Sequence, residues 1–133
     1  MQLQDQVVSL NLAKRMKELG FTQESLFYWA DDEDGNWVLV HKTMEVDNDY
    51  IMQICEEIKE NEDGAYVSAY TVAELGEILR GKWVVYKIQD GWNAIYEDMS
   101  ITLPPMVKGV AKTEADARAK LAIYLAENHL INQ

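Results

Sequence analysis

An Asp-Gly dipeptide between two runs of strand-forming residues is the feature that most restricts the fold of this chain. Residues 82–89 and 92–97 are rich in aromatic and β-branched side chains, and Asp90-Gly91 separates them. A two-residue connection of this composition favours a type I′ turn, whose twist matches that of two paired strands. The sequence therefore predicts an antiparallel hairpin over residues 83–97.

A second pair of short apolar runs predicts another hairpin over residues 25–41. Residues 25–30 and 37–41 carry the strand-forming side chains, and the six residues between them contain the turn formers Asp34-Gly35. A short edge strand is also expected near residues 106–110.

Four segments have the apolar spacing of a helix with one buried face, near residues 9–19, 49–60, 71–80 and 113–128. The second segment has the clearest repeat, formed by Ile51, Ile54, Cys55 and Ile58. Thr71 and Glu74 have the spacing of a capping box at the start of the third helix. Gly20 is expected to end the first helix in a left-handed conformation.

The order of these elements is helix, hairpin, two helices, hairpin and helix, which predicts an α+β fold. Hairpins imply antiparallel pairing, and the lack of alternating strand–helix–strand units argues against a parallel nucleotide-binding sheet. We expect the two hairpins to join one antiparallel sheet packed with about four helices, whose apolar stripes face one shared core. With 133 residues and no linker-like tract, the chain is expected to form a single domain over residues 1–133.

Negative charge is concentrated in one segment of the chain. The formal net charge is −11, and residues 31–63 contain twelve acids and two bases, a net charge of −10. The chain therefore lacks the basic footprint of a protein that binds DNA or RNA directly. An anionic membrane surface would also repel this segment. We expect a protein partner, with a basic surface, as the most suitable ligand.

The acids expected to contact such a partner are Asp31, Asp32, Glu33, Asp34, Asp47 and Asp49. Residues 31–35 also resemble part of a calcium-binding loop, which needs oxygen ligands at its first and twelfth positions. Aligning Gly35 with the loop glycine places Ala30 and His41 at those two positions. A solvated hairpin loop is therefore expected here, with no metal site.

Catalytic residues are not expected from the sequence. Cys55 could act as a nucleophile only with His41 or His129, and it lies in an apolar helical stripe where cysteine is usually a small core residue. One cysteine and two distant histidines do not supply a zinc site, and no glycine-rich phosphate loop is present. We expect no metal and no cofactor. The lone thiol, the lack of a signal-peptide pattern and the lack of a long apolar run indicate a cytoplasmic protein.

Four tryptophans lie in the expected strands or at their ends: Trp29, Trp37, Trp83 and Trp92. Most are expected to be core residues or to pair across strands. The alternative is that one or two form an exposed aromatic patch for a partner.

Three blocks of the sequence resemble a group of short uncharacterised proteins encoded in phage and prophage gene clusters. These blocks are residues 9–29, 68–79 and 114–128, and together they cover about half of the chain in the same order. The chain departs from the group at Tyr70 and Arg80, where prolines are expected, and at His129, where a glycine is common. The resemblance implies a protein of a mobile genetic element that works in the cytoplasm of a bacterial host. It implies no activity and no functional residue.

The sequence leads to three functional hypotheses. The first is a non-enzymatic phage or prophage accessory protein that acts by binding another protein. The alternative is an acidic DNA mimic that inhibits a host nucleic-acid enzyme, although acid confined to one segment is unlike the spread of charge that a mimic needs. The third is a small enzyme of unknown class.

Overall fold

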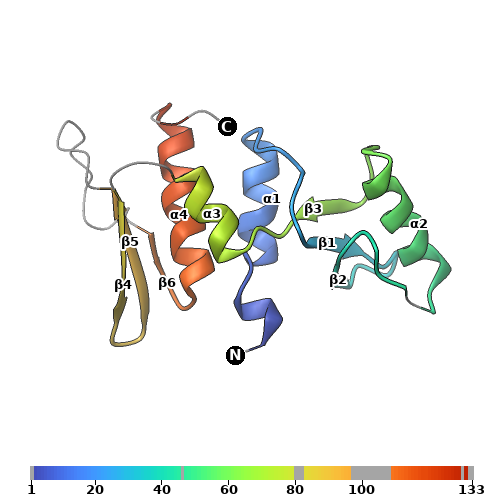
Figure 1. The fold of residues 1–133 in the computed structure, drawn as a ribbon, viewed down its shortest axis with the longest axis horizontal. Coiled ribbons are helices and arrows are strands. Elements are labelled where there is room, and N and C mark those ends of the chain that lie inside the picture. The colour runs from blue at the N-terminus through green and yellow to red at the C-terminus, as the bar shows by residue number, and fades with distance from the viewer. Residues whose placement is uncertain (1, 46, 80–82, 97–108, 130, 132–133) are drawn as a thin grey trace.

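The computed structural model describes residues 2–45, 47–79, 83–96, 109–129 and 131. This part of the chain has an α+β fold with four α-helices and two three-stranded antiparallel sheets (Figure 1). The elements in chain order are η1 (Leu3–Asp5), α1 (Leu10–Glu18), β1 (Tyr28–Asp31), β2 (Trp37–Val40), α2 (Asp49–Lys59), β3 (Tyr66–Ser68), α3 (Val72–Ile78), β4 (Trp83–Ile88), β5 (Gly91–Tyr96), β6 (Gly109–Ala111) and α4 (Glu114–Glu127).

The elements form successive layers along the longest axis of the molecule (Figure 1). Sheet β4-β5-β6 lies at one end, and helices α4, α3 and α1 form the middle. Sheet β2-β1-β3 follows, and α2 covers its far side at the other end. The helical layer is thus enclosed by the two sheets.

Both predicted hairpins are present, but they do not share a sheet. Strand β1 pairs with β2 and β3, whereas β5 pairs with β4 and β6, so each hairpin gains its own third strand. The expectation of one sheet is wrong because the helical layer separates the two hairpins. The expected type I′ turn at Asp90-Gly91 is also wrong, because Gly91 pairs with Ile88 in the ladder and the two connecting residues are Gln89-Asp90, with no positive φ at Asp90. The expected edge strand is confirmed at Gly109–Ala111, while residues 106–108 lie outside the described part of the chain.

The predicted helix ends are confirmed at two positions. Gly20 has φ +92°, the Phe21 N–H donates to the Met16 carbonyl and the Gly20 N–H donates to the Lys17 carbonyl, which is the double bond pattern of a Schellman end. Thr71 Oγ1 accepts from the Glu74 N–H at 3.2 Å, and Glu74 Oε1 accepts from the Thr71 N–H at 2.9 Å. The capping box therefore fixes the start of α3.

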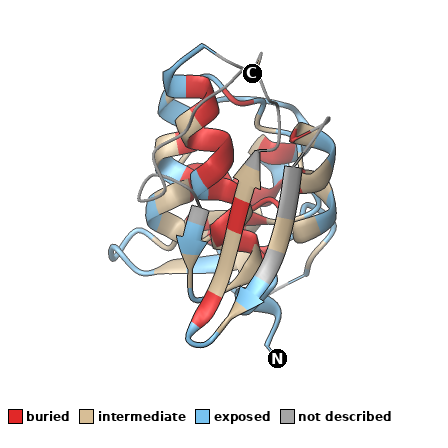
Figure 2. Ribbon diagram, turned by 90° about the vertical axis from the view of Figure 1, so that its left-hand side faces the viewer, coloured by how far each residue is buried: buried red, intermediate tan, exposed pale blue. Residues whose placement is uncertain are grey.

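The apolar stripes face two clusters of buried residues, so the expected single shared core is wrong for α2. The larger cluster lies between helices α1, α3 and α4 and the inner face of sheet β4-β5-β6. Helix α4 is buried along most of its length (Figure 2). The smaller cluster lies between α2 and the first sheet, and it contains Tyr28, Ala30, Val40, Ile51, Ile54, Cys55, Ile58 and Tyr66.

Sheet β2-β1-β3, the first in chain order, contacts both clusters because each of its two faces is covered. Tyr28 and Ala30 of β1 face α2, whereas Trp29 packs against the larger cluster. Successive side chains of a strand point to opposite faces. The indole N–H of Trp29 also donates to the Val8 carbonyl at 2.8 Å, which attaches the sheet to the segment before α1.

No helix in the described part of the chain is long and apolar enough to cross a membrane.

Candidate functional site

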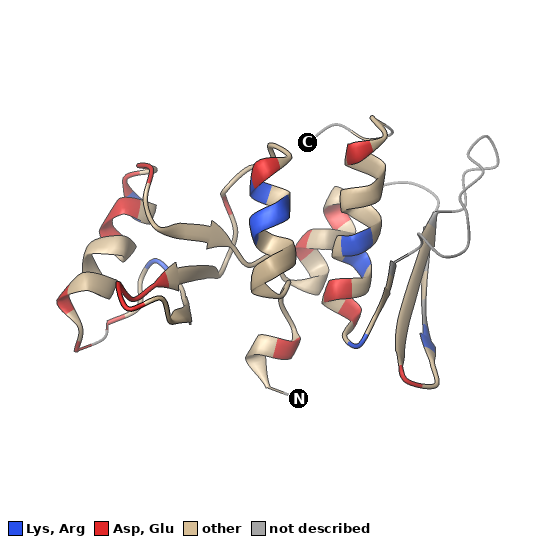
Figure 3. Ribbon diagram, turned by 180° about the vertical axis from the view of Figure 1, so that it is seen from behind, with Lys and Arg blue, Asp and Glu red and all other residues tan. Residues whose placement is uncertain are grey.

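The acids of residues 31–63 gather at the end of the molecule that carries α2. We call this region the acidic end; it comprises the β1–β2 loop, α2 and the segments on either side of α2 (Figure 3). Its described acids make one ion pair, from Lys59 to Glu56 at 3.0 Å, and both side chains are solvent-exposed. Most of the negative charge at this end is therefore not neutralised within the chain.

The β1–β2 loop is organised by two of the predicted acids. Asp31 Oδ1 accepts from the N–H groups of Glu33 and Gly35, and Asp32 Oδ1 accepts from those of Asp34 and Asn36, at 3.0–3.3 Å. Aspartates often close turns on their own backbone in this way. Asp31 and Asp32 are therefore half-buried parts of the turn.

The other four predicted acids are exposed: Glu33, Asp34, Asp47 and Asp49. Asp47 and Asp49 flank Asn48, whose Oδ1 accepts from the Ile51 N–H at 3.1 Å and caps α2. Asp49 lies in the first turn of α2, where a negative charge is stabilised by the helix dipole. The structure thus places the predicted acids at two neighbouring sites, the β1–β2 loop and the start of α2.

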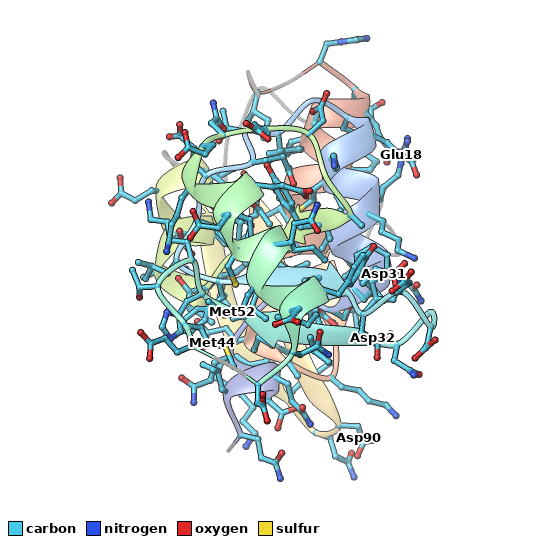
Figure 4. All side chains as sticks on the ribbon, turned by 90° about the vertical axis from the view of Figure 1, so that its right-hand side faces the viewer. Glu18, Asp31, Asp32, Met44, Met52 and Asp90 are labelled. Carbon is cyan, nitrogen blue, oxygen red and sulfur yellow. The ribbon has the colours of Figure 1, made fainter. Side chains whose placement is uncertain are left out.

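The two sites lie close together, because α2 packs on the sheet whose strand β1 ends at Asp31. The pKa of the Tyr50 phenol is raised by desolvation first, and then by the negative charges of Asp31 and Glu33. In the view from the α2 end, Asp31 and Asp32 lie on one side of α2, and Met44 and Met52 lie on the other (Figure 4).

The acids do not form a metal site in the described part of the chain, where no group of three or more potential ligands is found. The Oδ1 atoms of Asp31 and Asp32 already accept backbone hydrogen bonds. The loop geometry is therefore explained by the hairpin itself.

Cys55 is buried in the smaller cluster, as its position in the α2 stripe predicts. Burial raises the pKa of its thiol, which favours the unreactive protonated form. Its Sγ lies 3.9 Å from the His41 carbonyl oxygen, whereas the His41 ring contacts Thr43 Oγ1 and packs edge-to-face on Phe27. His129 ends α4 with φ +56°. The His41 ring thus contacts Thr43 and Phe27, and His129 follows a helix that packs in the larger cluster, whereas Cys55 lies in the smaller one.

A cleft that the sequence did not predict lies between η1, the start of α3, β5 and the start of α4. It encloses about 850 Å³, within the range of ligand-binding pockets. Its apolar wall is formed by Leu3, Phe27, Val72, Ala73 and Trp92. The caps of two helices reach it through Thr71 and Thr113, and each threonine accepts a hydrogen bond from the third residue of its helix.

Charged side chains of both signs also line the cleft. Arg118 pairs with Glu114 at 2.7 Å, and its Nη1 lies 3.5 Å from the Val72 carbonyl oxygen. Lys112 and Asp5 are exposed at the cleft. The capping box of Thr71 was the sequence signal for one part of the rim, but its approach to Thr113 depends on long-range packing that no local pattern encodes.

The tryptophans are placed as the core interpretation predicts, as far as the structure describes them. Trp29, Trp37 and Trp92 are half-buried and pack against the larger cluster. Lys14 Nζ lies 4.6 Å from the centroid of the Trp37 ring. Trp92 also lines the cleft. The Trp83 side chain lies outside the described part.

Comparisons with known proteins add no relative. No family model matches the chain, and neither the curated proteins nor the solved structures contain a significant match. The resemblance to the phage and prophage group therefore stays a prediction.

Proposed function

We propose that this chain is a non-enzymatic protein that binds a basic partner protein through its acidic end. The observation that supports this function is the exposed, largely unpaired negative charge on the β1–β2 loop and around α2. A charged patch of this kind attracts a partner of opposite charge and raises the association rate. In the setting that the sequence resemblance implies, the partner is a protein of the bacterial host or of the mobile element.

The DNA-mimic alternative receives less support. A mimic must present acid along a surface that imitates two rows of phosphates. Here the charge lies at one end, and the helical layer carries Lys14, Arg15 and Lys17 on α1 together with Arg118 and Lys120 on α4 (Figure 3). A local contact with a basic surface fits this distribution better.

The test uses a variant of the β1–β2 loop that removes charge and keeps the hydrogen bonds that close the turn. Asp31→Asn, Asp32→Asn, Glu33→Gln and Asp34→Asn together remove four charges, while the amide oxygens of the two asparagines introduced at positions 31 and 32 keep the acceptors that close the turn. The matched control removes four exposed acids elsewhere, through Glu18→Gln, Glu24→Gln, Asp90→Asn and Glu127→Gln.

Association with the partner captured from host lysate is then measured at several salt concentrations. At low salt we expect the loop variant to associate about tenfold more slowly, with little change in dissociation, and the control to change much less. An unchanged association rate would contradict the proposal. Competition between duplex DNA and the acidic end for the same site on the partner would instead support the DNA-mimic alternative.

A further inference from the structure

Phe27 is a wall that the large cleft shares with a second, smaller pocket. It lines the 850 Å³ cleft and also a pocket of about 350 Å³ whose other walls include Leu26, His41 and Lys42. The lining of both spaces is mainly apolar. We call the two together the groove, which extends from the start of α4 to the end of β2.

Two large apolar side chains are exposed beside the groove. Leu3 in η1 is 45% exposed, and Leu26, just before β1, is 64% exposed. The Leu26 N–H donates to Glu74 Oε2 at 3.1 Å, so the backbone that presents this side chain is attached to α3. Fixed apolar side chains next to an apolar groove are typical of a surface that binds another protein.

Charge indicates what kind of segment the groove accepts. Inside the groove the charges nearly cancel, so the groove itself favours apolar side chains: the lining carries Asp5 and Glu114 against Lys42, Lys112 and Arg118. At the His41 end, the chain continues through Glu45 and Asp47 into the acidic end. An occupant with apolar side chains in the groove and basic side chains beyond it would match both regions.

We propose that the groove binds a segment of a partner protein in which large apolar residues are followed by lysine or arginine. The apolar residues fill the cleft and the pocket beside Phe27, and the basic residues extend toward the acidic end. This inference rests on the proposed function and assigns the dissociation rate and the association rate to two different surfaces. The groove slows dissociation through buried anchors, and the acidic end accelerates association.

Ala73 offers a substitution that tests the groove directly. It lies in the first turn of α3, is exposed, and lines the cleft. Ala73→Trp fills the cleft without replacing a buried residue, and Asn11→Trp adds the same side chain at an exposed position of α1 that does not line the groove. Leu26→Ser is a second groove variant, because removing an exposed side chain leaves the core unchanged.

The probes are random peptides displayed on yeast and selected for binding to the intact protein. We expect enriched peptides to combine large apolar residues with lysine or arginine. Ala73→Trp should weaken their binding at least about tenfold through faster dissociation, Leu26→Ser should weaken it several-fold, and Asn11→Trp should leave it unchanged. The neutralised loop variant should slow association and leave dissociation nearly unchanged.

Several results would overturn the inference. These are no enrichment, enriched peptides that lack basic residues, or binding that neither groove variant weakens. Two other occupants are tested in parallel. Binding of oleate without peptide binding would make the groove a small-molecule site, and self-association abolished by Ala73→Trp would make it an interface between copies of this chain. If these peptides fail while the loop variant still slows association of the captured partner, the proposed function stands and the groove assignment is wrong.

Discussion

The backbone N–H of Ser9 donates a hydrogen bond of 2.7 Å to Asp116 Oδ1, which joins the start of α1 to the first turn of α4. Ser9 occupies the N-cap position of α1, but its side chain makes no capping bond. Asp116 instead serves two helices, because its N–H donates to the Thr113 cap and its carboxylate holds Ser9. This contact fixes the start of α1 to the start of α4, and the start of α4 lines the cleft.

Asp116→Ala should therefore destabilise the fold more than the loss of an exposed acid. We expect a decrease of about 2 kcal/mol in the free energy of unfolding, because a partly buried, charge-assisted hydrogen bond is lost. Asp116→Asn keeps an acceptor oxygen and should lose about half as much. Glu18→Ala, which removes an exposed ion pair with Arg15, should cost less than about 1 kcal/mol. Urea unfolding measures all three, and equal losses for Asp116→Ala and Glu18→Ala would contradict the assignment.

The single cysteine allows the α2 end to be followed separately from the rest of the molecule. Because Cys55 is buried, we expect very slow reaction with a thiol reagent in the native protein. The acids of the acidic end surround the smaller cluster and repel one another, so this cluster should open at a lower denaturant concentration than the larger one. The described tryptophans pack against the larger cluster. Labelling of Cys55 should precede the change in tryptophan fluorescence as urea is increased. Coincident transitions would show that the two clusters unfold together, and fast native labelling would favour the enzyme hypothesis.

Stability should decrease at alkaline pH. Burial raises the pKa of Tyr70 against a smaller opposite effect of its hydrogen bond to Thr22, and burial also raises the pKa of Cys55. Both groups are protonated in both states below their unfolded pKa values of about 8.5 for cysteine and about 10 for tyrosine. Above those values the unfolded chain loses its protons first, so the free energy of unfolding falls as pH rises toward the folded values. Urea titrations between about pH 7 and pH 11 should show this decline, and Tyr70→Phe combined with Cys55→Ala should make it shallower. An identical slope in that double variant would contradict the prediction.

His129→Gly should stabilise the protein. His129 follows α4 with φ +56°, a left-handed conformation that strains a side-chain-bearing residue but not glycine. The gain should reach up to about 1 kcal/mol, because relief of this strain exceeds the added entropy of the unfolded glycine chain. Asn128→Gly is the control, because Asn128 has φ −102° and its side chain donates to the Tyr124 carbonyl. That control should destabilise, and a loss of melting temperature in His129→Gly would count against the interpretation.

Features that depend on neighbouring residues could be predicted from the sequence. The β4–β5 hairpin, the capping box of Thr71 and Glu74, and the left-handed Gly20 each depend on residues close together in the chain, although the hairpin connection lies one residue earlier than expected. Strand β3 was not predicted, because all three of its residues are buried and give no alternating pattern. Its pairing with β1 also depends on residues 36–40 positions away, which no local signal specifies.

One of the two candidate sites could be predicted from the sequence, and the other could not. The acids of the β1–β2 loop and of the start of α2 could be named because charge is visible in composition, and their closeness follows from packing of α2 on the first sheet. The cleft was not predicted, because Leu3, Phe27 and Trp92 come from three distant parts of the chain. None of these residues has a local pattern that distinguishes it from a core residue.

Consecutive side chains of strand β1 pack into two different clusters, one on each face of its sheet. Tyr28 packs in the smaller cluster and Trp29 packs against the larger one, although they are consecutive residues. Substitutions at these two positions should act nearly additively, because their side chains share no packing partners across the sheet. Sequence variation that adapts the α2 end to a new partner therefore needs few compensating changes among the helices. Divergence within a lineage would then be fast on one side of this strand and slow on the other.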